Sequence, residues 1–319
     1  MENIKNKKKI LAVVGPTAGG KSTLAIDLAL ELGGEVVCCD SMQVYRSMQI
    51  GTAAPTAEEK AAVPHRLFAY RDPKQPFSCS DYAASAARQI NSLTARVKLP
   101  VFCGGTGLYL DSLLFGVGGD EAKPDPEYRV MLEAMAEREG NAALHAMLER
   151  LDPEAACAIH PNNVRRVIRA LEICRECGSK TEHDRRAREK GAKYDACVIG
   201  LRYADRSRLV DRIDRRVDKM MELGLVEETC RLEAEGVFAA NQTAAQAIGY
   251  KEILPYIHGE CSLEEATEKL KIATRQYAKR QMTWFSAKPY VKWLECDGIE
   301  DEKTYKKIVK NALKLFHNS

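Results

Sequence analysis

The chain has 319 residues, of which 45% are hydrophobic and 29% charged, so it can bury a large core in one or two domains. Its formal net charge of +3 is close to neutral, and it has no low-complexity tract or evident repeat, which excludes a fibrous or disordered protein. No apolar run approaches the roughly 18 residues that a membrane-spanning helix needs, so we expect no membrane segment.

The cysteines and the first residues both favour a cytoplasmic protein. Eleven scattered cysteines, an odd number, fit reduced thiols better than a disulfide framework. Cys174 and Cys177 form the one Cys-x-x-Cys pair, and no second pair or His pair has the spacing of a zinc site. The basic residues 1–9 precede a short apolar strand, not the longer apolar region of a signal peptide.

A phosphate-binding loop dominates the first part of the chain. The apolar segment 10–14 predicts a strand, residues 23–32 have the spacing of a helix, and between them lies Gly15-Pro-Thr-Ala-Gly-Gly-Lys-Ser22. The glycines let backbone amides converge on an anion, Lys21 adds a positive charge, and the Ser22 hydroxyl can bind Mg²⁺. The loop predicts a bound polyphosphate, but not by itself ATP hydrolysis.

A candidate catalytic carboxylate follows the second predicted strand. Two glycines end the first helix, and the apolar segment 35–39 leads into Asp40-Ser-Met-Gln-Val-Tyr45. Open α/β sheets bind their ligands at the carboxyl ends of the strands, so we expect Asp40 to lie at the site.

Strands and helices continue to alternate up to residue 114. A capping box at 56–59 starts a short helix, and the following segments predict a strand at 65–70, a helix at 80–97, a strand at 99–103 and a glycine-rich turn at 104–109 that opens a helix. This alternation predicts an α/β fold with a parallel sheet flanked by helices. The strand at 99–103 ends without the Asp that P-loop phosphoryl-transfer enzymes use for Mg²⁺.

Helical patterns alone follow residue 119. Helices are predicted at 126–139, 141–151 and 163–177, then a charged polar stretch at 181–193, and we interpret 120–194 as a helical insertion. The strand at 196–201 is expected to rejoin the sheet, so the core would comprise 1–119 and 195–319. The remainder is predicted to be helical, at 207–223, 226–235, 244–257 and 263–285.

Basic residues gather on three of these helices. Residues 160–220 contain 17 Lys and Arg against 10 Asp and Glu, and residues 271–293 contain 6 basic and no acidic residues. The arginines stand four residues apart on two helices, and the last helix alternates aromatic and basic side chains from Tyr277 to Trp284. This pattern suits a polyanion such as nucleic acid, although solvated helix faces and buried aromatics explain it as well.

Together the motifs resemble the bacterial tRNA dimethylallyltransferase (isopentenyltransferase, IPP transferase) family. The resemblance runs in family order through Gly15–Ser22, Asp40–Tyr45, Gly104-Gly-Thr-Gly-Leu-Tyr109, Arg165-Arg-Val-Ile-Arg-Ala-Leu-Glu172, Arg216, Ala247-Ile-Gly-Tyr-Lys-Glu252 and Tyr277-Ala-Lys-Arg-Gln-Met-Thr-Trp-Phe285. Many bacterial members have Ser or Thr where this chain has Gly20 or Ser22, and both residues here preserve the cradle and the hydroxyl. The zinc-finger extension of eukaryotic members is not found, as expected for the bacterial form.

The resemblance implies a P-loop NTPase-like fold with an all-helical insertion, and a defined reaction. Family members transfer a dimethylallyl group from dimethylallyl diphosphate to N6 of adenosine 37 of tRNA and release diphosphate. The implied partners are that donor and the tRNA anticodon stem-loop with adenosines 36 to 38, which the insertion grips. The implied cofactor is Mg²⁺, bound partly by Ser22, and we expect a monomer.

The resemblance also implies residue roles. Asp40 matches the general base, Thr106 a position at the substrate adenosine, and Arg216 an arginine that clamps the diphosphate. The diphosphate would be bound by Gly15, Pro16, Thr17, Ala18, Gly19, Gly20, Lys21 and Ser22. The tRNA would be bound by Asp40, Ser41, Met42, Gln43, Thr106, Arg129, Arg165, Arg166, Val167, Ile168, Arg169, Gln246, Ala247, Ile248, Gly249, Tyr250 and Lys251.

Three other functions stay open on the sequence alone. A small-nucleotide kinase would bind ATP in the same loop, an adenylate-type isopentenyltransferase of cytokinin synthesis would prenylate AMP, and a nucleotide-binding RNA chaperone would bind tRNA without turnover. The strand end without an acid, the isolated Asp40 and the basic insertion favour a prenyl diphosphate as the ligand of the loop.

Overall fold

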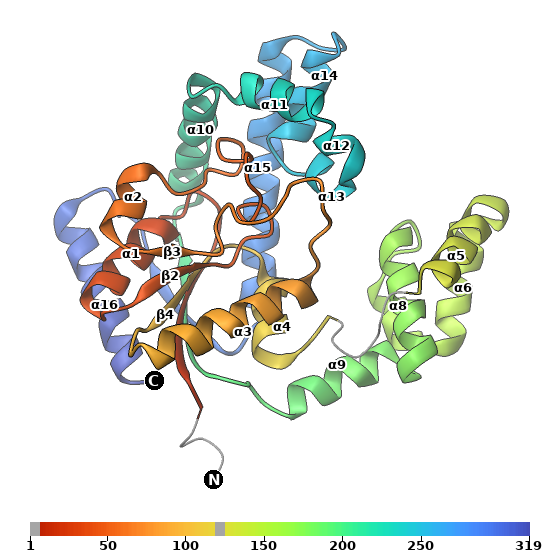
Figure 1. The fold of residues 1–319 in the computed structure, drawn as a ribbon, viewed down its shortest axis with the longest axis horizontal. Helices are drawn as coiled ribbons and strands as arrows, with labels where there is room; N and C mark the ends of the chain where they lie inside the picture. The colour runs from red at the N-terminus through yellow and green to blue at the C-terminus, as the bar shows by residue number, and fades with distance from the viewer. Residues whose placement is uncertain (1–6, 119–124) are drawn as a thin grey trace. The chain divides into compact units, whose positions relative to one another are not determined.

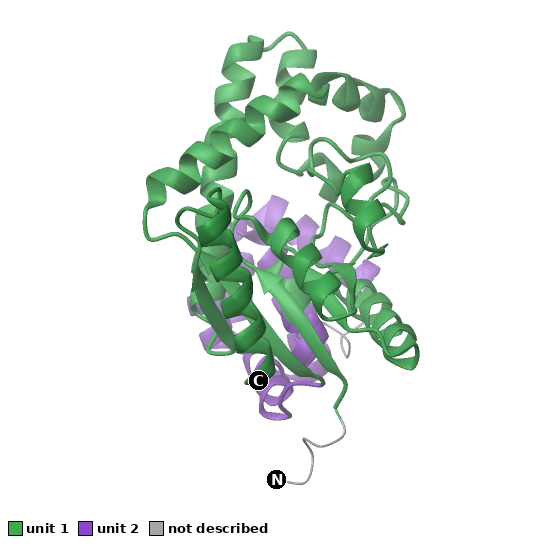
Figure 2. Cartoon of the chain, turned by 90° about the vertical axis from the view of Figure 1, so that its left-hand side faces the viewer, with its two compact units in different colours: residues 1–110, 194–319 green, residues 111–193 purple. Residues whose placement is uncertain are grey.

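The computed structural model describes residues 7–118 and 125–319 (Figure 1). The chain forms two compact units: unit 1 comprises Met1–Leu110 and Tyr194–Ser319, and unit 2 comprises Asp111–Lys193 (Figure 2). The expected domain boundary at residues 119 and 120, and residues 1–6 of the basic start, lie outside the described residues.

Unit 1 is built on a six-stranded parallel sheet with the order β3-β2-β4-β1-β5-β6. The strands are β1 (Lys9–Val14), β2 (Glu35–Cys38), β3 (His65–Arg66), β4 (Pro100–Cys103), β5 (Asp195–Arg202) and β6 (Val291–Glu295). Strand β1 lies inside the sheet, with Leu11 opposite Val101 of β4 and Cys197 of β5, so its apolar run is buried on both faces. The predicted parallel α/β sheet is confirmed, and β5 rejoins it as expected.

Helices surround this sheet and extend beyond it. In unit 1 they are α1 (Lys21–Glu31), α2 (Ala57–Ala62), α3 (Cys79–Ala95), α10 (Arg206–Glu222), α11 (Leu225–Ala234), α12 (Val237–Ala240), α13 (Gln242–Ala245), α14 (Tyr250–Ile257), α15 (Leu263–Ser286) and α16 (Glu302–His317). Helices α1 and α16 share one core with the strands, through Leu28, Phe316 and Ile199 among others. Helix α4 (Gly107–Phe115) continues from unit 1 into unit 2.

Unit 2 consists of short helices around their own core. The helices are α5 (Pro126–Glu139), α6 (Asn141–Leu151), α7 (Pro153–Ala158), α8 (Val164–Cys177) and α9 (Lys180–Glu189). Leu132, Leu144, Leu148 and Leu171 are fully buried at its centre. The ends of the unit meet, because Lys193 N donates to Leu114 O at 2.7 Å and Arg188 pairs with the buried Asp111.

The structure corrects four of the predicted elements. The strand expected at 65–70 ends at Arg66, because Leu67 and Ala69 have positive φ angles of 62° and 46°. The helix expected at 244–257 is interrupted between α13 and α14, and the polar stretch at 181–193 contains helix α9. The chain after residue 285 is not purely helical, since β6 forms the edge of the sheet beside β5. Among the described residues, no helix is both long and apolar enough to cross a bilayer.

Candidate active site

The phosphate-binding loop joins β1 to α1 in a conformation that needs its glycines. Gly15 has φ 138°, and a Cβ there would lie 2.8 Å from the carbonyl oxygen of Leu201. Gly20 has φ 87°, and a Cβ there would lie 2.6 Å from Cδ1 of Ile299. Helix α1 begins at Lys21, and within the described structure no side chain caps its first amides. The loop therefore offers backbone N–H groups and the positive end of a helix dipole to an anion.

Two half-buried cations lie beside this loop. Lys21 Nζ donates to Pro16 O at 2.7 Å, and burial is the main reason that the pKa of Lys21 falls to about 8. Burial also lowers the pKa of Arg216, whose guanidinium has no hydrogen-bond or ion-pair partner within residues 7–118 and 125–319. A cation held out of water without a partner is costly, so an anionic ligand between these two groups would be stabilised.

Helix α10 brings both of its arginines to the loop. Arg212 Nε donates to Ala18 O at 2.8 Å, and its guanidinium also pairs with Glu300. Arg216, one helical turn later, reaches the cavity that Lys21 lines. The two arginines therefore differ in position, because Arg212 binds the loop backbone and Arg216 faces the ligand space.

Asp40 lies at the carboxyl end of β2, at the same sheet edge as the loop. Its Oδ1 accepts from Met42 N at 2.9 Å and from Gln43 N at 3.3 Å, which fixes the carboxylate in a local turn. Thr106 lies behind it, where its Oγ1 accepts from Ser41 N at 3.0 Å. The carboxylate therefore keeps Oδ2 for a ligand, while Thr106 holds the segment that carries it.

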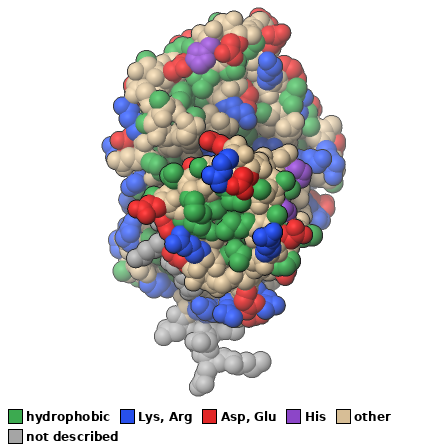
Figure 3. Space-filling model, turned by 90° about the vertical axis from the view of Figure 1, so that its right-hand side faces the viewer, with side chains coloured by type: hydrophobic (Ala, Val, Ile, Leu, Met, Phe, Trp, Pro, Cys, Tyr) green, Lys and Arg blue, Asp and Glu red, His purple; other side chains and the backbone are tan. Residues whose placement is uncertain are grey.

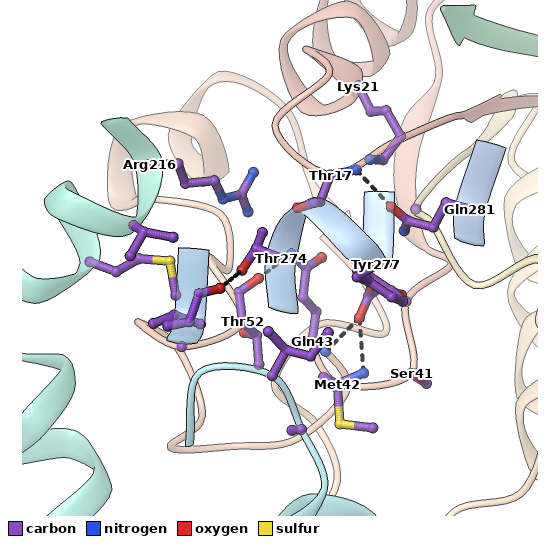
Figure 4. Close-up of a pocket in the computed structure, with 18 of the residues that line it drawn as sticks. Thr17, Lys21, Ser41, Met42, Gln43, Thr52, Arg216, Thr274, Tyr277 and Gln281 are labelled. Atoms are coloured by element: carbon purple, nitrogen blue, oxygen red, sulfur yellow. Dashed lines mark hydrogen bonds between the residues drawn. The ribbon is translucent and has the colours of Figure 1, made fainter. Parts of the chain in front are cut away.

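A cavity of about 320 Å³ brings these groups together (Figure 4). It is lined from the loop and α1, from the segment after β2, from α10 and from α15. Asp40 is the one acidic side chain among its described lining residues. The predicted site residues on its wall are Thr17, Lys21, Ser22, Asp40, Ser41, Met42, Gln43, Arg216, Gln246, Ala247, Ile248 and Lys251.

A second cavity, of about 790 Å³, adjoins the first on the outer side of the loop. Both cavities are lined by Lys21, Ser22 and Arg216, so these residues stand where the two meet. The second cavity adds cationic side chains from α10, namely Arg212, Arg215 and Lys219. The described linings of both cavities thus contain more cationic than acidic side chains, with Asp40 the acid of the first and Glu59 the acid of the second.

A buried carboxylate shapes the cavity wall opposite the loop. Glu228 of α11 accepts from the three backbone N–H groups of residues 49–51 at 2.9–3.1 Å and from the Tyr250 hydroxyl at 2.7 Å. The next residue after this 49–51 segment is Thr52, whose carbonyl accepts from Gln43 Nε2 at 2.9 Å. Gln43, a predicted adenosine contact, is therefore oriented by a network that begins at Glu228.

The predicted segment 246–251 spans the break between α13 and α14 and the first two residues of α14. Gln246 and Lys251 are exposed and line the cavity, whereas Gly249 and Tyr250 are buried. Gly249 has φ 107°, which starts α14 and turns the Tyr250 ring inward, against Gly51. Some residues of this motif therefore face the cavity, and the buried ones hold the motif in place.

Helix α15 contributes several residues to the cavity. The sequence allowed two explanations for its aromatic residues and assigned no role to Gln281. Tyr277 and Arg280 line the cavity, and Gln281 lines it from a nearly buried position, with 5% of its surface exposed. Trp284 packs against the glycine turn, since a Cβ on Gly107 would lie 2.1 Å from the indole. Tyr277 thus belongs to the site and Trp284 to the packing. Aromatic and basic spacing did not separate them, and no sequence signal distinguished Gln281.

The predicted RNA face of unit 2 combines exposed arginines with core residues. Arg165 and Arg166 are exposed at the start of α8, whereas Val167 and Ile168 are buried and offer no surface to RNA. The face seen in Figure 3 carries Lys and Arg side chains among acidic ones, with apolar side chains near its centre.

The two remaining arginines of this predicted face share one carboxylate. Glu172, with 1% of its side chain exposed, accepts from Nε and Nη2 of Arg129 at 2.8–2.9 Å and from Arg169 at 3.1 Å. The two guanidiniums are held side by side and remain partly exposed, at 43% and 28%. A pair of fixed guanidiniums is suited to bidentate contacts with phosphate.

The donor set at the loop can accommodate magnesium only with help from a ligand. Within the described residues, no group of three or more His, Cys, Asp and Glu side chains could hold a metal ion. Ser22 opens α1 and lines both cavities beside Lys21. Because Mg²⁺ keeps several waters and readily binds phosphate oxygens, a single hydroxyl beside a diphosphate fits this ion.

Comparisons with known proteins agree with this arrangement. The model of the IPP transferase family matches residues 43–288, and that of the isopentenyl transferase family matches residues 8–73. A tRNA dimethylallyltransferase of Caldanaerobacter subterraneus is 44% identical over 95% of this chain and 96% of its own.

Two solved structures are similar over nearly the whole chain. The tRNA isopentenylpyrophosphate transferase of Bacillus halodurans is 43% identical, with a TM-score of 0.69, over 98% of this chain and 100% of its own. A eukaryotic dimethylallyltransferase acting on tRNA is 30% identical, with a TM-score of 0.78, over 94% of this chain and 78% of its own. With a family model over most of its length and relatives above 40% identity, the chain belongs to the IPP transferase family.

Proposed function

We propose that this chain transfers a dimethylallyl group from dimethylallyl diphosphate to N6 of adenosine 37 of tRNA, with release of diphosphate. The observation that carries the proposal is the composition of the cavity, where the phosphate loop, Lys21 and Arg216 occur with Asp40, the one acid among the lining residues that the structure describes. The relatives are named for the same reaction on tRNA. In this reading the loop binds a leaving group, so no acid is needed for attack on phosphorus.

The diphosphate end of the donor would occupy the junction of the two cavities. Cleavage of the allylic C–O bond leaves negative charge on the departing diphosphate. The loop amides, Lys21 and Arg216 would surround that position. The amides and Lys21, which is bonded to Pro16 O, are held in place before the reaction, so they stabilise the charge with little reorganisation. A Mg²⁺ ion held by Ser22 and diphosphate oxygens would supply further neutralisation of this charge.

The acceptor adenine would enter beside Asp40. A stacked base cannot present N6 to an allylic carbon in the cavity, so the nucleotide must be turned out of its stack. The free Oδ2 of Asp40 can accept a hydrogen bond from the amine and then its proton, while Oδ1 stays bound to Met42 N. This contact favours adenine over guanine and uracil, because both of these bases present a carbonyl oxygen where adenine presents its amine.

Recognition of the tRNA is assigned to both units. In unit 1, Gln246 and Lys251 lie at the cavity, and in unit 2 the exposed Arg165 and Arg166 and the paired Arg129 and Arg169 can bind backbone phosphates. We propose that unit 2 grips the anticodon stem-loop and that the protein acts as a monomer in the cytoplasm.

The proposal is tested with dimethylallyl diphosphate, Mg²⁺ and an unmodified tRNA that carries adenosines 36 to 38, followed by mass analysis of its nucleosides. Prenylated adenosine is the expected product. Prenylation of AMP but not of tRNA would support an adenylate-type enzyme, ATP-dependent phosphorylation of a nucleotide would support a kinase, and tRNA binding without turnover would support a chaperone.

The role of Asp40 has its own test. Asp40→Asn keeps the acceptor for Met42 N but removes the base, so kcat should fall by about 10²–10⁴-fold. Asp72→Asn, at an exposed loop position, serves as the control and should keep wild-type kcat. Activity of Asp40→Asn within a few-fold of wild type would refute the general-base role.

A further inference from the structure

The side chain of Gln281 connects two loops that are distant in sequence. Its Oε1 accepts from Thr17 N at 2.7 Å (Figure 4). Its Nε2 donates to Gly105 O at 3.1 Å. With 5% of its surface exposed, it makes these bonds inside the protein and lines the cavity at the same time. The amide therefore bridges the phosphate loop and the glycine turn after β4.

The turn is built to receive this amide. A Cβ on Gly105 would lie 1.9 Å from Gln281 Nε2, a separation that no real pair of atoms can adopt. Since Gly105 has no positive φ, its glycine is required by this close approach and not by backbone conformation. Gly105 and Gln281 therefore act as one structural unit.

The two bridged loops carry the two sides of the reaction. Thr17 belongs to the loop that would hold the leaving diphosphate. Gly105 precedes Thr106, which binds Ser41 N beside Asp40. The distance between the donor carbon and the amine of the acceptor thus depends on how these loops are spaced, and alignment of that kind governs the rate of a transfer.

We infer that Gln281 is a positioning residue that sets the spacing between the phosphate loop and the segment that carries Asp40. This inference rests on the proposed function, because it assigns the diphosphate to one loop and the adenine to the other. A glutamine is needed since one end must accept from an N–H and the other must donate to a carbonyl. Glutamate would set a carboxylate oxygen against Gly105 O, and leucine would make neither bond.

The first test separates positioning from binding. Gln281→Leu and Gln281→Glu should lower kcat by about 10²-fold, the scale expected when reacting groups are misplaced by about 1 Å. The dissociation constants of dimethylallyl diphosphate and of tRNA, measured separately, should change less than about threefold, since each ligand contacts mainly one loop. Gln276→Leu, an exposed glutamine on the same helix, is the matched control and should behave as wild type.

Unchanged kcat in both Gln281 variants would overturn the inference. It would also be overturned if the two dissociation constants rose in parallel with the loss of kcat, because the residue would then serve binding or general stability. Failure of the wild-type protein to prenylate tRNA is a different result, which would refute the proposed function.

The second test uses the close approach at Gly105. Gly105→Ala in the wild-type background should displace the Gln281 amide and lower kcat. In a Gln281→Ala background the added methyl group has room, so Gly105→Ala should cause little further loss. Losses that multiply in the double variant would show independent sites and contradict the inference.

Discussion

At the residue scale, the clearest electrostatic feature is the half-buried Lys21. A lysine with a pKa of about 8 is protonated below pH 8 and loses its charge above it, because burial disfavours the cation. A bound diphosphate supplies the missing counter-charge and therefore raises this pKa. Above pH 8, Lys21 must therefore take up a proton when the diphosphate binds, whereas below pH 8 it is already protonated.

The affinity for dimethylallyl diphosphate should accordingly fall as the pH rises through 8. Linkage of one proton predicts that Kd rises by at most about tenfold per pH unit above that value, and that Lys21 contributes no pH dependence below it. Calorimetric titration from pH 6.5 to 9.5 measures this slope, and buffers of different ionisation enthalpy measure the proton uptake. Lys21→Met binds more weakly and should lose this slope above pH 8; an equal slope in both proteins would contradict the assignment.

The sequence predicted many of the residues that line the cavity but few of the residues that hold them in place. The loop, Asp40 and Arg216 were predicted from motifs, and the structure places them on one cavity. Thr106, predicted at the adenosine, accepts a hydrogen bond from Ser41 N, next to Asp40 on the cavity wall. The role of Gln281 could not be predicted from the sequence, because its hydrogen-bond partner Thr17 is 264 positions away and local sequence patterns do not report such distant contacts.

At the element scale, the predictions failed where local patterns were weak or misleading. Helix α9 has no buried residue, and its turns are stabilised by ion pairs such as Lys180–Asp184, so it lacks the apolar period that predicts a helix. The edge strand β6 has five residues, of which only Val291 is buried, so it lacks a strand signal. Between α13 and α14 the helical pattern continues in the sequence, but Gly249 at φ 107° starts a new helix.

The loop at residues 49–51 depends on an acid from another element. Glu228→Gln places an amide N–H₂ group among three backbone N–H donors and the Tyr250 hydroxyl, so at least one donor loses its acceptor. We expect the free energy of unfolding to fall by about 1–3 kcal/mol and the melting temperature to fall with it. Glu227→Gln, the exposed neighbour on α11, is the control for thermal denaturation. Equal melting temperatures of the two variants would show that this network adds no stability.

At the scale of the whole molecule, the described cavity and the exposed arginines of α8 belong to different units, so we expect that they can be varied separately. The cavity is lined entirely by unit 1, whereas Arg165 and Arg166 belong to unit 2. The double variant Arg165→Ala/Arg166→Ala should weaken tRNA binding and reduce the slope of log K against log salt concentration by about 1.5, because each lost phosphate contact removes about 0.7–0.9. The affinity for dimethylallyl diphosphate should stay at the wild-type value.

The control for this prediction is Arg138→Ala/Arg150→Ala, which removes two exposed arginines from other helices of unit 2. Filter binding of tRNA at 50–200 mM salt measures both slopes. If both double variants changed the slope equally, net charge and not the start of α8 would determine RNA binding.

The hydrogen bond between the two ends of unit 2 has a consequence for how the sequences of such enzymes can diverge. Because Leu114 and Lys193 are hydrogen-bonded to each other, the two ends of the 111–193 segment lie next to one another. Insertions or deletions inside a segment whose ends are adjacent alter neither the strand order nor the spacing of the cavity residues. Lengthening such a segment adds little to the entropic cost of folding. Changes can therefore accumulate in this segment during evolution while the residues of the cavity stay in place.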